Sequence, residues 1–171
     1  MADYYTPTIV QQVIPLADIT SLECLLLGEI FQSGLVAGGL YFTSEDGPTD
    51  MIWVESEKLR TCLNDPAAKG STAFNEIINQ RGDAILQGDE VEIDASMEWW
   101  TVLFQDIVRR SSTLDHISVI MSYTCSKLRA DGLGGMAMLI TAETVRSKST
   151  EDILAEFMAE AEASGEMKPL A

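Results

Sequence analysis

The sequence is poor in the residues that most often carry chemistry or cross membranes. It has one histidine, three cysteines and no apolar run near the roughly 20 residues that a membrane span needs. Any histidine-dependent acid–base or nucleophilic reaction would have to use His116. His116 and Cys125 lie on one predicted strand, nine residues and therefore about 30 Å apart at about 3.3 Å per residue. Their side chains point to opposite faces of that strand, so they cannot form a catalytic dyad. Three isolated cysteines also lack the tight ligand pairs of a structural zinc site.

Other motifs of cofactor and phosphate sites are missing as well. The one dense glycine cluster, Gly132–Gly135, is not followed by the Lys and Ser/Thr of a P-loop, and we predict a hairpin turn there. The start MADYYTPTIVQQ has neither the basic region nor the continuous apolar region of a signal peptide. With an odd number of widely spaced cysteines, this predicts a cytoplasmic protein with reduced thiols. We expect no cofactor.

What is present indicates an ordinary folded protein. A chain of 171 residues with 46% hydrophobic and 22% charged residues can bury a good core, so we predict a single domain over residues 1–171. Helical and strand periodicities alternate without the spacing of β-α-β units. This favours an α+β fold in which antiparallel hairpins pack with helices.

The predicted elements occur twice in the same order, as an extended segment, a helix, a hairpin and a helix. In the first half they are 9–13, 20–32, the strands 38–43 and 51–54, and 56–63. In the second half they are 91–93, 95–110, the strands 116–126 and 136–141, and 149–163. We therefore consider a duplication of 9–63 and 91–163, joined by 64–90, which adds a helix over 71–80. The hypothesis concerns topology only, because the halves share little sequence.

Apolar periodicity predicts which side chains form the core. The helix over 95–110 has apolar residues at positions i, i+3, i+4, i+7 and i+8, and the helix over 149–163 repeats that spacing. The strand from His116 alternates apolar and polar residues, so one face should be buried and the other wet or in contact with a partner. We expect one common core from Trp100, Phe104, Ile107, Ile117, Val119, Met121, Leu154 and Phe157.

Charge is distributed unevenly along the chain. The net charge is −16, but residues 107–148 carry six Lys/Arg against three Asp/Glu. A protein this acidic repels nucleic acid and anionic membranes and attracts basic protein surfaces. The densest acidic stretch contains Asp83, Asp89, Glu90, Glu92 and Asp94. It lacks the ligand order of a calcium loop, so we interpret it as a partner-binding or merely solubilising edge.

Three stretches resemble a family of uncharacterised small acidic bacterial proteins carried on plasmids and integrating elements. They are YYTPT from Tyr4, GMAMLITA from Gly135 and KSTEDIL from Lys148. The resemblance implies a cytosolic bacterial setting and carries no catalytic residues. Mobile elements often encode inhibitors of host defence, and several such inhibitors imitate DNA with acidic surfaces.

Together these observations predict a non-catalytic, acidic protein-binding or inhibitory protein that engages a basic partner, with DNA mimicry as the sharper version. Two alternatives stay open. One is a small-molecule binder or enzyme with a pocket lined by Trp53, Trp99 and Trp100. The other is a structural subunit that forms a homodimer through its polar strand face or a helix. Glu98 beside two tryptophans is a weak catalytic candidate, because a carboxylate in a first helical turn has a simpler role.

Overall fold

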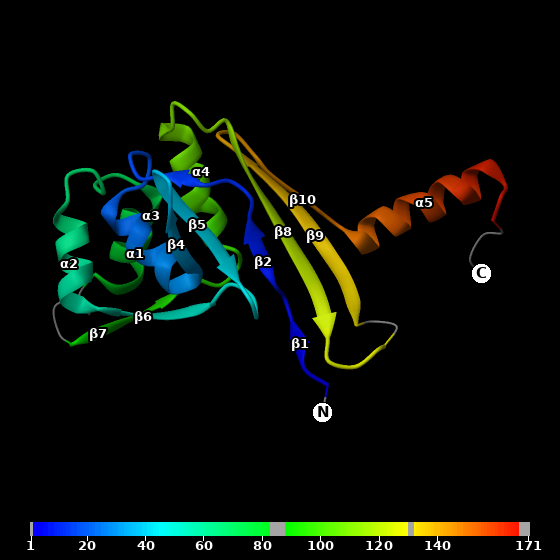
Figure 1. The fold of residues 1–171 in the computed structure, drawn as a ribbon, viewed down its shortest axis with the longest axis horizontal. Helices are drawn as coiled ribbons and strands as arrows, with labels where there is room; N and C mark the ends of the chain where they lie inside the picture. The colour runs from blue at the N-terminus through cyan, green and yellow to red at the C-terminus, as the bar shows by residue number, and fades with distance from the viewer. Residues whose placement is uncertain (1, 83–87, 130–131, 168–171) are drawn as a thin grey trace.

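The computed structural model describes residues 2–82, 88–129 and 132–167, which form an α+β fold (Figure 1). The helices within these residues are α1 (Ser21–Ile30), α2 (Ser56–Asn64), α3 (Thr72–Arg81), α4 (Trp100–Arg110) and α5 (Thr150–Ser164). The strands are β1 (Tyr4–Tyr5), β2 (Thr8–Val10), β3 (Ile14–Pro15), β4 (Gln32–Val36), β5 (Gly39–Ser44), β6 (Met51–Glu55), β7 (Glu90–Asp94), β8 (His116–Cys125), β9 (Leu133–Thr141) and β10 (Val145–Ser149).

Eight of the strands form one antiparallel sheet. Its order is β10-β9-β8-β2-β5-β3, with β1 paired to β8 and β4 paired to β5. The register places Ile9 of β2 opposite both Ile120 of β8 and Thr43 of β5. Because facing residues of antiparallel strands lie on the same side of a sheet, this register defines two sheet faces.

The core lies on one of these faces, beneath α1 and α4. Phe31, Phe42, Trp100 and Phe104 meet there edge to face, with ring centroids 5.4–6.2 Å apart. The predicted core is confirmed for Trp100, Phe104, Ile107, Ile117, Val119 and Met121, which are all buried. The parity predicted for β8 is therefore correct.

The predicted burial of the last helix is wrong. Leu154 and Phe157 are 59% and 60% exposed, and α5 contains no buried residue. Figure 1 shows α5 leaving the end of β10 and extending away from the other helices. The apolar stripe exists in the sequence, but nothing within the described residues covers it.

The first predicted hairpin is also wrong. β5 pairs with β4 through a tight turn at Gly38, whose φ of 82° suits glycine, and β6 pairs with the distant β7 in a separate two-stranded sheet. The second predicted hairpin, β8 with β9, is confirmed. Since the two hairpins occupy unrelated positions, the topology does not support the proposed duplication of 9–63 and 91–163.

The start of α4 differs from the prediction for a local reason. Met97 and Glu98 both have positive φ values, 58° and 56°, so the helix cannot include them and begins at Trp100. Glu98 thus lies in a turn before the helix, not in its first turn. The other helix starts agree with the prediction within a residue or two, and Ser149 caps α5 with a capping box to Asp152.

Candidate protein-binding surface

The predicted acidic stretch lies on the small sheet of β6 and β7. Val91 and Ile93 of β7 point into the core, so the alternate residues Glu90, Glu92 and Asp94 point outward. The register places Trp53 of β6 opposite Glu92 and Glu55 opposite Glu90. We call the outward face of Trp53, Glu55, Glu90, Glu92 and Asp94 the acidic ribbon.

The acidic ribbon places like charges against each other. Glu55 and Glu90 face directly across the two strands, an arrangement that destabilises a sheet. Lys58 lies 2.8 Å from the Glu55 carboxylate, and Arg81 lies 3.3 Å from that of Glu92, so two cations only partly balance the ribbon. A sequence that tolerates such an arrangement on a surface strand often does so for function.

An aromatic ring stands in the middle of this charge. Trp53 is 55% exposed although its neighbours Ile52 and Val54 are buried. Exposed tryptophan surrounded by carboxylates suits a basic partner, because the indole provides contact area and a face for Lys or Arg. The sequence did not indicate that Trp53 faces outward, because β6 begins with four apolar residues in a row.

The remaining predicted site residues differ in their roles. Asp89 precedes β7, is exposed, and its backbone carbonyl accepts a hydrogen bond from the Ser56 N–H. Asp94 also holds the next turn: its carboxylate accepts from the Ser96 N–H, and hydrogen bonds with Ser96 lower its pKa. Asp83 lies outside the described residues.

The three tryptophans lie in different surroundings. Trp53 is on the acidic ribbon, Trp100 is in the core, and Trp99 is half-buried at the start of α4. Four surface cavities lie among the described residues, and no tryptophan lines any of these four. Glu98 also lines none of these four cavities, so they do not join it to the tryptophans.

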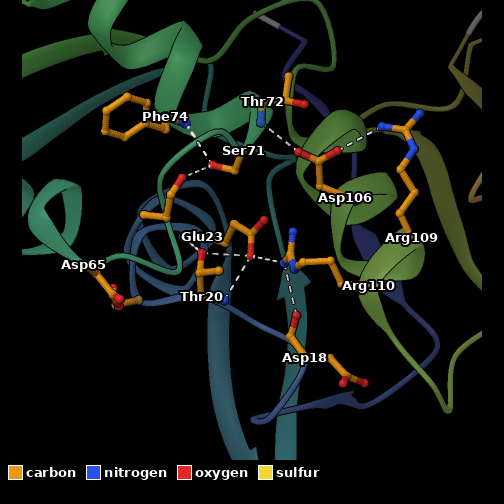
Figure 2. Close-up of polar contacts among 12 residues, drawn as sticks. Asp18, Thr20, Glu23, Asp65, Ser71, Thr72, Phe74, Asp106, Arg109 and Arg110 are labelled. Atoms are coloured by element: carbon orange, nitrogen blue, oxygen red, sulfur yellow. Dashed lines mark hydrogen bonds and ion pairs between the residues drawn. The ribbon is translucent and has the colours of Figure 1, made fainter.

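A second polar cluster joins the ends of three helices (Figure 2). Arg110 at the end of α4 donates to Glu23 Oε2 at 2.5 Å, and the same oxygen accepts from the backbone N–H and hydroxyl of Thr20 at 2.9 Å each. Glu23 is fully buried, and its Oε1 has no partner among the described residues. We call the pair Glu23–Arg110 the helix clamp, because it ties the start of α1 to the end of α4.

The neighbouring carboxylate repeats this arrangement at α3. Asp106 accepts from the Thr72 N–H and from Arg109, at 2.9 Å each, so it occupies the positive end of the α3 dipole. Two cavities of about 430 and 400 Å³ adjoin the cluster and share Arg110 in their walls. Both helix starts are already satisfied by the protein's own carboxylates, so the cluster is built to hold helices together and offers an anion little.

The thiols and the histidine show no catalytic arrangement. Burial and the nearby Cys62 raise the pKa of Cys24, which makes this thiol a weaker nucleophile at neutral pH. His116 is a half-exposed residue at the start of β8 and lies beside Asp115, whose pKa the histidine lowers. Within the described part of the chain, no three His, Cys, Asp or Glu side chains are placed to hold a metal ion.

Comparison with known proteins adds no relative. No protein-family model, no curated protein and no solved structure matches this chain. Across the described residues, none of the helices has the length and apolarity needed to cross a membrane.

Proposed function

We propose that this is a non-catalytic binding protein whose acidic ribbon engages a basic surface on a partner protein. The observation that carries the proposal is the cross-strand row of carboxylates around exposed Trp53, with Glu55 and Glu90 directly opposed. Self-repulsion of this kind weakens the free protein, and a cationic partner would relieve it.

The spacing of the row favours a nucleic-acid-binding protein as the partner. Alternate residues of a strand lie about 6.8 Å apart, so Glu90, Glu92 and Asp94 repeat at about twice the 3.4 Å rise of one DNA strand. A partner surface that normally contacts phosphates would meet one carboxylate for every second phosphate step. An inhibitor that imitates DNA is thus the sharper form of the proposal.

The test is capture of bacterial proteins by the immobilised chain, compared between two charge-matched variants. The ribbon variant carries Glu90→Gln and Glu92→Gln on the ribbon and Asp89→Asn just before β7, and leaves Asp94, which holds a turn, unchanged. The control variant removes three exposed carboxylates from other places, with Glu45→Gln, Glu143→Gln and Glu166→Gln.

We expect a basic partner that the wild type and the control variant capture and the ribbon variant does not. Its release should begin as salt rises, because the screening length falls from about 10 Å at 0.1 M to about 3 Å at 1 M. Duplex DNA added as a competitor should displace a partner that uses a nucleic-acid site. Equal capture by the ribbon variant would contradict the proposal.

A further inference from the structure

One face of the large sheet is uncovered. Opposite the core, the register puts Ile9, Tyr41, Ile120 and Leu139 on the same side of the sheet, and all four are 40–54% exposed. We call this side of β5, β2, β8, β9 and β10 the open face. No described helix buries it.

The open face differs in charge from the rest of the molecule. The eight strands of the large sheet contain no Asp or Glu, although the chain has 27 such residues. The register places Arg146 and Lys148 of β10 on the open face; Lys148 pairs with Glu156 of its own chain, so Arg146 is the cation that this edge offers a partner. An uncharged, partly apolar sheet face with a basic edge is complementary to an acidic amphipathic helix.

Such a helix is part of the same chain. On α5 the side chains of Ile153, Leu154, Phe157, Met158 and Ala161 form one stripe, and none is buried. From Ser149 to Met167 the chain has six carboxylates and no Lys or Arg. Two α5 helices packed on each other would therefore place like charges together.

The helix leaves directly from the edge strand of the sheet. β10 ends at Ser149 and α5 begins at Thr150, so no linker separates them. The capping box from Ser149 to Asp152 begins the helix there, and an exposed ion pair of Lys148 with Glu156, at 2.6 Å, links the helix to β10. The apolar stripe therefore stays uncovered among the described residues of one copy.

We propose that two copies of this chain form a symmetric dimer in which α5 of each covers the open face of the other. The dimensions agree, because 15 helical residues span about 22 Å and the five strands β10, β9, β8, β2 and β5 about 19 Å. Carboxylates of α5 then lie near the basic edge of the partner copy. Reciprocal exchange of this kind is the isologous contact of a two-fold dimer.

Sedimentation velocity on the full chain tests the dimer. The wild type should sediment at twice 18.7 kDa at about 0.1 mM, since two helices on two sheet faces bury an interface of standard size. Leu154→Glu with Phe157→Glu should give a monomer. The control, Ala159→Glu with Ala163→Glu, adds the same charge to the opposite side of α5 and should stay dimeric.

A mixing experiment identifies what α5 contacts. Ile9→Glu with Ile120→Glu disrupts the open face and should also give a monomer. Mixed with the α5 variant, it should form a mixed dimer, because one intact helix then meets one intact open face. A monomeric wild type, a dimer insensitive to either variant, or a mixture that stays monomeric would overturn the proposal. The ribbon variant should dimerise normally, so this result is independent of the proposed function.

Discussion

Removing Arg110 should destabilise the protein more than removing any exposed cation. Arg110→Met keeps much of the side chain's volume and deletes only its charge and donors. It leaves the carboxylate of Glu23, which is fully buried, without an opposite charge. The two donors of Thr20 remain, but they bind only Oε2. The helix clamp would then hold an uncompensated charge in the interior.

The size of the effect follows from that burial. Breaking a buried ion pair by removing one partner costs about 3–5 kcal/mol. Because the Arg110 side chain is itself 37% exposed, water can partly replace it, and we expect the lower end, about 3 kcal/mol. For a chain of this size each kcal/mol lowers the melting temperature by about 2–4 °C, which predicts a fall of about 6–12 °C.

Urea unfolding followed by circular dichroism gives the free energy, and a double-mutant cycle isolates the pair. Glu23→Gln should destabilise the wild type yet stabilise Arg110→Met, because glutamine keeps the capping geometry and removes the buried charge. Lys58→Ala, which breaks an exposed pair, is the control and should change little. A cost below about 1 kcal/mol for Arg110→Met, or an equal effect of Glu23→Gln in both backgrounds, would refute the clamp.

Two further outcomes test the acidic ribbon and α5. Glu90→Lys replaces the repulsion between Glu90 and Glu55 with an attraction, so it should raise the free energy of unfolding by about 0.5–1 kcal/mol. The same change should weaken capture of the partner. If the variant is not more stable than the wild type, the β6–β7 register is wrong. The pKa of Asp152 is lowered by hydrogen bonds from Ser149, so its stabilising effect is present above its unfolded pKa and is lost as pH falls through the folded value. Urea midpoints of the wild type and Asp152→Asn should therefore differ at pH 7 and converge toward pH 3; a difference independent of pH would show that the charge is not involved.

Much of the fold could be predicted because its elements carry strong local patterns. The alternation of β8 and the apolar spacing of α4 gave the right core positions, such as Ile117 and Phe104. Four short strands escaped prediction: β1, β3, β4 and β10. β4 reads QSGLV and has no buried side chain, and β10 reads VRSKS, so neither shows the alternation of a half-buried strand.

Strand pairing was harder to predict than strand existence. β6 follows β5 closely, so a local hairpin was the economical expectation, yet β6 pairs with β7 some forty residues later. Both strands bury alternate residues, and that pattern specifies which face is buried but not which strand lies beside it. For the same reason the acidic residues of β7 were recognised without their cross-strand neighbours Trp53 and Glu55.

The wrong prediction for α5 shows what amphipathicity does and does not determine. The stripe from Ile153 to Ala161 requires that something cover it, and the sequence was interpreted as if that cover were the chain's own core. The sheet already has its core face filled by α1 and α4, and no helix among the described residues buries its other face.

In the proposed dimer, the uncovered helix of each copy covers the open sheet face of the other. The carboxylates of the chain divide accordingly. The carboxylates of β7 form a row beside Trp53. The carboxylates of α5 lie far from that row in the sequence, and in the proposed dimer they lie near β10 of the other copy. The acidic ribbon would thus bind the basic partner, and α5 would bind the second copy. If so, mutations of the two surfaces should act separately, as expected for distant sites that share no residues.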